Sequence, residues 1–159
     1  MTIKVGIGYD SHRFSAGRPL RLGGVTVPHT HGLAGHSDGD VALHALVDAL
    51  LGAIAIGDIG TFFPDDDPQW KGADSTRFVK KVVETLQQDQ VKVQQVDITI
   101  IAERPKLAEK IGAMRAATAK ALGVDMAAVS IKAKTNEGMG WIGRGEGIAA
   151  IAVATVSTG

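Results

Sequence analysis

The stretch DGDVALHALVDALLGAIAI, residues 38–56, decides which fold the rest of the chain can adopt. Its apolar residues are dense and recur at helical spacing, and its alanines and leucines favour helix. Gly57 follows where a helix would end, so the sequence predicts one long, largely apolar helix. His44, Asp48 and Gly52 interrupt the apolar run, which falls short of the roughly 18 residues that a membrane span needs. We therefore expect a buried helix of a domain and no membrane partner.

Alternating and periodic segments on either side of this helix predict further strands and helices. Residues 3–9 alternate like a half-buried strand, which places Asp10, Ser11 and His12 in a loop after it. Apolar runs on both sides of Gly23-Gly24 predict a hairpin over residues 20–27. The other predictions are helices over residues 75–90 and 106–122, strands over 91–102, 129–135 and 148–156, and loops over 29–35, 62–72 and 138–147.

The predicted helices are too few to cover both faces of a sheet. Strands separated by long helices indicate one layered α/β or α+β domain over residues 1–159, with the helices on one sheet face. Residues 148–156 are apolar at nearly every position, so we expect both faces of that strand to be buried. Another copy of the chain is the simplest cover for the second face, and the sequence therefore predicts a homo-oligomer.

The composition excludes several classes of function. The chain has 159 residues with 17 basic and 17 acidic side chains, so its net charge of 0 attracts neither nucleic acid nor an anionic membrane. It contains no cysteine, which excludes disulfides, thiolate metal ligands and cysteine nucleophiles. The first residues alternate like a strand and do not resemble a targeting peptide, so we expect a cytoplasmic protein. Any bound anion must be held by local charges or by a metal.

Two histidines and one carboxylate are candidate metal ligands. Asp10 and His12 form an Asp-x-His pair whose side chains can point the same way, and His44 lies on the apolar helix, where an unpartnered imidazole is costly. Such a set is a three-ligand zinc site with an open fourth position, which can polarise a phosphoryl oxygen. Asp40 and Asp48 lie one turn before and after His44 and could orient it. The alternative is that His44 is a core histidine with satisfied hydrogen bonds.

The segment His36-Ser37-Asp38-Gly39-Asp40 at the start of the helix has two interpretations. Ser37 with Asp40 three residues later forms a capping box, which is the interpretation that the pattern favours. The free N–H groups and partial positive charge of the same helix end also suit a phosphate.

Two loops offer further polar groups. Asp58-Ile59-Gly60 and Asp65-Asp66-Asp67 supply carboxylates, although an acidic triplet is more typical of a solvated loop than of a site for sugar hydroxyls or a hard cation. Lys106 follows Pro105 and supplies a cation.

The last third of the chain carries two more candidates. Lys134-Thr135 and Glu137 supply a cation, a hydroxyl and a magnesium ligand at a strand end. Residues 143–147, GRGEG, form neither a Walker loop nor a dinucleotide fingerprint. They are either a tight turn with a structural Arg144–Glu146 pair or an anion site.

These stretches together resemble the 2-C-methyl-D-erythritol 2,4-cyclodiphosphate synthase family, in family order and over essentially the whole chain. The matching motifs are Gly8-Tyr9-Asp10-Ser11-His12; His36-Ser37-Asp38-Gly39-Asp40-Val41 with His44-Ala45 and Asp48-Ala49; Gly57-Asp58-Ile59-Gly60; Phe63-Pro64-Asp65 with Asp67; Lys71-Gly72-Ala73-Asp74-Ser75; Pro105-Lys106; and residues 143–147. Two places differ from the usual pattern. Glu103-Arg104 stands where Gln-Ala is common, and Gly138-Met139-Gly140-Trp141 stands where Lys-Leu-Gly with Phe or Tyr is frequent.

The resemblance implies a reaction and its metal ions. The 2-phosphate of a diphosphocytidyl-methylerythritol would attack the β-phosphate of the same molecule, giving the cyclic diphosphate and CMP in non-mevalonate isoprenoid synthesis. Asp10, His12 and His44 would hold zinc, and Glu137 would hold a second divalent ion, magnesium or manganese. His36 and Thr135 would help to stabilise the transition state. The alternatives are a zinc-dependent nucleotide-diphosphate phosphodiesterase and a non-catalytic trimeric nucleotide-binding regulator.

The resemblance also implies how the substrate and the subunits are arranged. The fold would be an α+β domain with a mixed sheet, packed as a homotrimer with active sites between subunits. Tyr9, Trp141 and Arg144 would face a cavity along the trimer axis, and whether an isoprenoid diphosphate binds there stays open. The substrate would contact Asp10, His12, His36, Ser37 and Glu137, with methylerythritol near Asp58, Ile59, Gly60, Phe63, Pro64, Asp65 and Asp67, and cytidine diphosphate near Ala102, Pro105, Lys106, Leu107, Ala108, Lys134 and Thr135.

Overall fold

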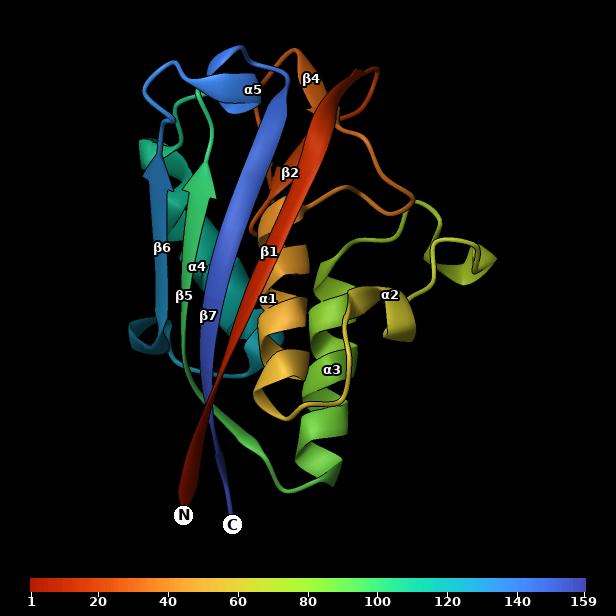
Figure 1. Ribbon diagram of the computed structural model, residues 1–159, viewed down its shortest axis with the longest axis vertical. Coiled ribbons are helices and arrows are strands. Elements are labelled where there is room, and N and C mark those ends of the chain that lie inside the picture. Colours follow the sequence, from red (N-terminus) through yellow and green to blue (C-terminus); the bar gives the residue numbers. More distant parts are fainter.

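The computed structural model describes residues 1–159, in which five strands form one mixed sheet in the order β4-β1-β7-β5-β6 (Figure 1). The long strands β1 (Thr2–Ala16) and β7 (Gly147–Thr158) pair antiparallel along almost their whole length. Strand β5 (Lys92–Ile101) runs antiparallel to β7 and parallel to β6 (Val129–Lys134), and the short β4 (His31–Leu33) forms the other edge. The predicted mixed sheet is therefore confirmed.

Three helices lie together on one side of this sheet, as predicted (Figure 1). They are α1 (Val41–Ala53), α3 (Thr76–Gln88) and α4 (Ile111–Leu122). The predicted hairpin is present as β2 (Leu20–Leu22) and β3 (Val25–Val27). The single-turn helix α5 (Gly140–Gly143) lies within the predicted loop 138–147, and α2 (Ile59–Phe62) ends where the predicted loop 62–72 begins. Short 3₁₀ turns cover Pro68–Trp70, Ala108–Lys110 and Met126–Ala128. None of the helices has both the length and the apolar character needed to cross a membrane.

Helix α1 forms the centre of the core, and 11 of its 13 residues are buried. It begins at Val41, not at residue 38, because Gly39 has a φ of 76° and the preceding backbone is not helical. The N-cap is Asp40, whose side chain accepts hydrogen bonds from the backbone N–H groups of Leu43, Gly23 and Gly24. The capping box predicted with Ser37 is therefore wrong. The Asp40 side chain ties the start of the helix to the β2–β3 hairpin instead.

Strand β1 continues well beyond the predicted end. It was expected to stop at Tyr9 and to leave Asp10 and His12 in a loop, but it pairs with β7 as far as Arg13 and then with β4. The continuation was missed because residues 10–13 are polar, although their neighbours in β7 keep the ladder of hydrogen bonds intact. As a result Asp10 and His12 lie on a regular strand and point to the same face.

The start of α4 also differs from the prediction. The helix was expected from Lys106 but begins at Ile111, after a 3₁₀ turn. Leu107 is buried outside the helix, so apolar residues at helical spacing did not mark its true beginning. Its end is as predicted, because Gly123 adopts the left-handed conformation with a φ of 71°.

The two faces of β1 have opposite surroundings. Gly6 and Gly8 are buried against α1, while the large side chains of Ile3, Val5 and Ile7 on the other face are 55%, 61% and 70% exposed. Ile151 of β7 is also exposed on this outer face. Within one chain, then, the second face of β7 is not fully buried, and the expectation that both faces are buried is not met by the chain alone.

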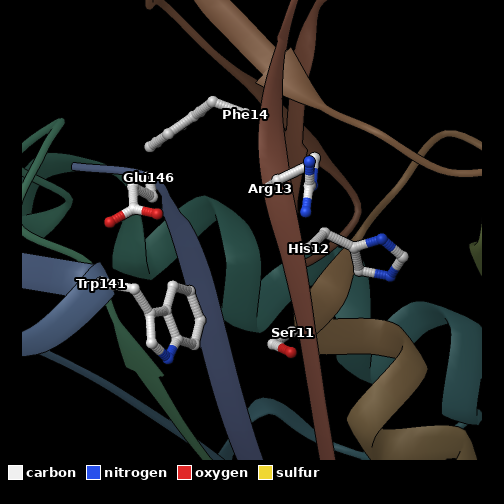
Figure 2. A pocket seen from close by; sticks show the side chains of 6 residues that line it. All are labelled: Ser11, His12, Arg13, Phe14, Trp141 and Glu146. Carbon is white, nitrogen blue, oxygen red and sulfur yellow. The ribbon is translucent and has the colours of Figure 1, made fainter. Parts of the chain in front are cut away.

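A cavity of about 530 Å³ lies beside the upper part of β1 (Figure 2). Its lining includes Ser11, Phe14, Glu146 and the indole of Trp141, which comes from α5. Arg144 lines a different cavity and forms an ion pair with Glu146 at 2.6 Å. The tight-turn interpretation of residues 143–147 is thus supported by an Arg–Glu pair.

Candidate functional site

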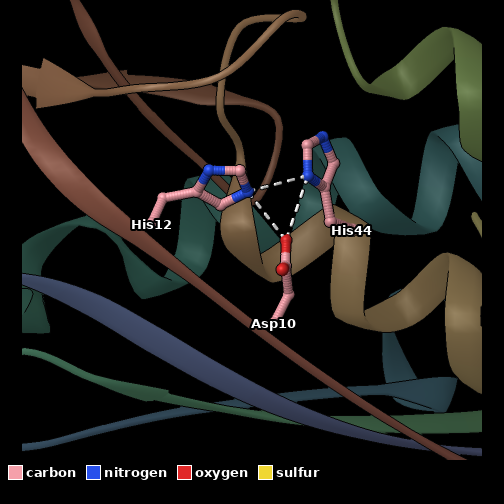
Figure 3. Close-up of side chains that lie close together, drawn as sticks. All are labelled: Asp10, His12 and His44. Carbon is pink, nitrogen blue, oxygen red and sulfur yellow. Dashed lines mark hydrogen bonds and ion pairs between the residues drawn. The ribbon is translucent and has the colours of Figure 1, made fainter. Parts of the chain in front are cut away.

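Asp10, His12 and His44 bring three ligand atoms together (Figure 3). His12 Nε2 lies 2.8 Å from Asp10 Oδ2 and 3.2 Å from His44 Nδ1, and His44 Nδ1 lies 3.1 Å from the same Asp10 oxygen. Four ligands at zinc bond lengths of 2.0–2.1 Å form a tetrahedron with edges of about 3.3 Å. The triangle of ligand atoms is therefore close to one face of a tetrahedral zinc site, and the residues present fit a metal of this kind.

Two different elements position this triad. Asp10 and His12 are two residues apart and lie on the same, inner face of β1, and His44 lies one turn into α1. Strand and helix approach closely because glycines line the contact from β1. The packing of β1 on α1 therefore brings the three ligands into one place.

Hydrogen bonds to the far ring nitrogens determine which nitrogens of the histidines are free. His12 Nδ1 lies 2.5 Å from the carbonyl oxygen of Ala34, which can only accept, so Nδ1 carries a proton and Nε2 faces the triad. His44 Nε2 lies 3.0 Å from the hydroxyls of Ser37 and Ser75. Both imidazoles are thus oriented with one nitrogen directed at the ligand triangle, as metal-binding histidines require.

The Ser75 hydroxyl connects His44 to a carboxylate. It donates to Asp38 Oδ1 at 2.5 Å, so the hydroxyl oxygen is free to accept the Nε2–H of His44. The prediction that Asp40 and Asp48 orient His44 is wrong. Asp40 caps α1, and Asp48 accepts from the backbone N–H of Ile59 at 2.7 Å.

The charges of the triad suit a cation. Burial alone would raise the pKa of Asp10, but hydrogen bonds and positive charge from His12 and His44 outweigh it and hold this pKa well below its ordinary value. Burial would lower the pKa of His12, but its hydrogen bond with the Asp10 carboxylate and that negative charge raise the pKa instead. Asp10 is therefore an anion at neutral pH, as a metal ligand must be.

A cavity of about 200 Å³ surrounds the triad and brings several predicted residues together. Those that line it beside the triad are His36, Ser37, Ile59, Gly60, Phe63 and Asp65. Asp58, Pro64 and Asp67 do not line it: Asp58 caps α2 through Thr61, and Asp67 caps the following 3₁₀ turn through Gln69. The backbone carbonyl of Asp67 nevertheless accepts a hydrogen bond from His36 Nε2 at 2.9 Å.

Two aromatic residues of this cavity were not predicted. Phe78 of α3 stacks on Phe63 with ring centroids 4.5 Å apart, and Trp70 meets both rings edge to face. Helical spacing had identified Phe78 as a core residue only, and no pattern in the loop singled out Trp70. Phe78 is brought close to His44, with ring centroids 5.9 Å apart, by the packing of α3 on α1, whereas Trp70 is placed by the folding of the loop between α2 and α3.

The residues predicted to hold the nucleotide line a second cavity of about 510 Å³. It shares no lining residue with the cavity around the triad. Glu103 also lines it, whereas Glu137 is exposed and lines neither cavity. The predicted residues that line it are Ala102, Pro105, Lys106, Leu107, Ala108, Lys134 and Thr135.

Comparison with known proteins agrees with the family resemblance seen in the sequence, over nearly the whole chain. A relative from Salinibacter ruber, 2-C-methyl-D-erythritol 2,4-cyclodiphosphate synthase, is 53% identical over 156 residues, which cover 98% of this chain and 99% of the relative. The protein of that name from Symbiobacterium thermophilum is 55% identical over 153 residues, 96% of this chain and 98% of its own. A solved structure of such a synthase in a CDP-bound form superposes with a TM-score of 0.89 at 36% identity, covering 97% of this chain and all of that one. The model of the YgbB family matches residues 3–157, and the chain belongs to this family.

Proposed function

We propose that the chain converts 4-diphosphocytidyl-2-C-methyl-D-erythritol 2-phosphate to 2-C-methyl-D-erythritol 2,4-cyclodiphosphate with release of CMP. The cyclodiphosphate synthase activity is the one named for its relatives, and one solved relative is a CDP-bound form. The observation that carries the proposal is the triad of Asp10, His12 and His44, whose ligand atoms fit a tetrahedral metal inside a cavity.

The reaction needs positioning and charge neutralisation more than a protein nucleophile. An oxygen of the 2-phosphate forms the new bond to the β-phosphorus, and the bond from that phosphorus to the bridging oxygen breaks, so CMP leaves with the electron pair. Holding the two phosphates in line lowers the barrier by up to roughly 7–11 kcal/mol, as in other well-oriented intramolecular reactions. A zinc ion held by the triad would polarise a phosphoryl oxygen.

We assign the remaining residues to four tasks. His36 and Thr135 stabilise the transition state, and Glu137 would hold a second divalent ion, magnesium or manganese, which would offset phosphate charge. His36 is oriented for this by its bond to the Asp67 carbonyl. Methylerythritol lies against Ser37, Ile59, Gly60, Phe63 and Asp65, which line the cavity around the triad. The nucleotide lies in the cavity with Lys106 and Lys134, whose ammonium groups offset its negative charge.

We also propose that the active chain is a homotrimer with its sites between subunits. The outer face of β1 exposes large apolar side chains, which a second copy would bury. The triad lies between β1 and α1, whereas the nucleotide cavity lies at the ends of β5 and β6, on the other side of β7 in the sheet order. If the triad of one copy and the nucleotide cavity of a neighbouring copy together form one site, their separation within a single chain is explained.

One incubation tests the proposed activity. The protein, the cytidyl substrate, zinc and magnesium are combined, and CMP release is followed together with the phosphorus NMR spectrum of the product. We expect CMP and a cyclic diphosphate. An open monophosphate would instead identify a phosphodiesterase. A protein that neither converts the substrate nor holds near-stoichiometric zinc would be a nucleotide-binding regulator.

A further inference from the structure

Glu103 holds the loop that carries Thr135 and Glu137. Its Oε1 accepts the backbone N–H of Asn136 at 2.7 Å and that of Gly138 at 3.2 Å. These two donors flank Glu137, whose own N–H donates to the Thr135 hydroxyl at 3.2 Å. Three successive N–H groups are thus bound to side-chain oxygens, two of them to a single carboxylate atom.

The conformation of this loop is one that needs such support. Glu137 has a φ of 54° and Gly138 a φ of 73°, so the backbone is left-handed at both positions. A residue other than glycine is strained there by roughly 1–2 kcal/mol. Successive N–H groups in such a turn form a concave donor set that suits an anion, and here the Glu103 carboxylate fills it.

Glu103 reaches the loop from a different strand. It follows β5, is half-buried and lines the nucleotide cavity, whereas the loop follows β6. The Glu137 side chain is exposed and has no partner within the chain that would fix its position. The direction of the Glu137 carboxylate is therefore determined by the backbone that Glu103 holds.

We propose that Glu103 is a positioning residue, which presents the Thr135 hydroxyl and the Glu137 carboxylate together to the substrate diphosphate and its divalent ion. This inference rests on the proposed function. A Gln carbonyl oxygen can accept hydrogen bonds from the same two N–H groups. The role therefore requires a hydrogen-bond acceptor at this position and does not require a negative charge.

Two variants separate these contributions. Glu103→Ala removes the acceptor, and Glu103→Gln keeps it while removing the charge. For Glu103→Ala we expect the magnesium concentration at half-maximal CMP release to rise about tenfold, as the loss of hydrogen bonds to a charged group would produce. For Glu103→Gln we expect it to stay within about twofold of the wild-type value, since two acceptor bonds remain. Zinc content should be unchanged in both variants, because the triad lies on other elements.

Coupling to Glu137 gives a stricter criterion. If Glu103 acts through Glu137, the two effects should not add. The double variant Glu103→Ala/Glu137→Ala should then need the same magnesium concentration for half-maximal CMP release as Glu137→Ala alone. Hydrogen exchange provides a readout independent of turnover. The amides of Asn136 and Gly138 should lose protection in Glu103→Ala and keep it in Glu103→Gln.

The outcomes distinguish the two proposals. A wild-type protein that releases no CMP contradicts the proposed function. An active wild type whose magnesium dependence and amide protection are the same in Glu103→Ala overturns the role of Glu103. So does equal impairment of the Ala and Gln variants, because the charge would then matter and not the acceptor.

Discussion

The backbone of Gly8 lies so close to Ala45 of α1 that a Cβ atom on Gly8 would be 1.9 Å from the Ala45 carbonyl oxygen. His44 immediately precedes Ala45, and Asp10 is two residues beyond Gly8 on the same face of β1. The absence of a side chain at Gly8 therefore sets the distance between the two elements that supply the metal ligands.

Replacing Gly8 by alanine should separate β1 from α1. We expect Gly8→Ala to lower the free energy of unfolding by about 3 kcal/mol, the upper part of the range for overpacked cores, and to weaken zinc retention. Gly112→Ala is the matched control, because Gly112 is exposed in the first turn of α4 and a Cβ atom there would have no neighbour within 4 Å. Alanine at this position should raise the free energy of unfolding by about 0.5–1 kcal/mol. Urea denaturation measures the free energy of unfolding of each variant, and metal analysis measures its zinc content. A Gly8→Ala protein as stable as the wild type would contradict the close packing.

Removing one ligand should empty the metal site. We expect His44→Ala to reduce zinc affinity by more than about 100-fold, beyond the loss typical of supporting residues, and to abolish CMP release. Metal analysis of the purified protein and the CMP assay check this prediction. A fully active His44→Ala protein would end the metal-site proposal.

The Ser75 hydroxyl should matter more for zinc than the Ser37 hydroxyl. Both contact His44 Nε2 at 3.0 Å, but Ser75 also donates to Asp38 and is thereby fixed as an acceptor. We expect Ser75→Ala to weaken zinc binding by about 10–100-fold and Ser37→Ala to weaken it less. Competition with a chromogenic chelator measures both affinities. Equal effects, or a stronger effect at Ser37, would contradict the Asp38–Ser75–His44 connection.

Asp48 should make stability depend on pH in a direction opposite to that of most carboxylates. Burial raises its pKa above the ordinary value, and the nearby charges of Asp10 and Asp58 add to this against the hydrogen bond from Ile59. The folded state therefore binds the proton more tightly than the unfolded state, and stability from this group falls as the pH rises from about 3.8 through the folded pKa.

Asp48→Asn keeps an oxygen acceptor for the Ile59 N–H and cannot ionise. Its stability relative to the wild type should therefore increase between about pH 3.5 and pH 7, where the wild-type carboxyl loses its proton. Urea midpoints of both proteins across this range give the difference. A relative stability that stays constant or falls with rising pH would contradict the assignment.

A charge on the outer face of β1 should prevent assembly without unfolding the chain. Ile7 is 70% exposed, so Ile7→Lys introduces no buried charge into a single chain. We expect sedimentation velocity to show a trimer for the wild type and a monomer for Ile7→Lys, with unchanged circular dichroism. Met126→Lys, on an exposed 3₁₀ turn away from this strand, should remain trimeric. A monomeric wild type would contradict the trimer.

The sequence predicted those parts of the molecule that depend on local patterns. Periodicity and Gly123 identified the helices, and the Asp-x-His pair together with His44 indicated the triad before any distance was known. What it could not provide is contact between distant segments. Ser75 meets His44 across 31 residues, and an isolated serine carries no signal of such a partner.

The errors have the same origin. The polar residues 10–13 resembled a loop because their strand pairing depends on β7, more than 130 residues later in the chain. Ser37 resembled a helix cap because the hairpin that binds Asp40 is visible only in the folded structure. Local preference was outweighed in both cases by tertiary hydrogen bonds.

Strand β1 has a strict two-residue period with different tasks for odd and even positions. The even-numbered Gly6 and Gly8 pack on the helix, and Asp10 and His12 continue this face as metal-ligand candidates. The odd-numbered residues from Ile3 to Tyr9 present the exposed apolar surface. Deleting a single residue ahead of Asp10 would exchange these tasks, turning both ligands outward and Tyr9 inward. The metal-ligand candidates and the exposed apolar surface therefore share one strand register, and neither set can be shifted along the strand without displacing the other.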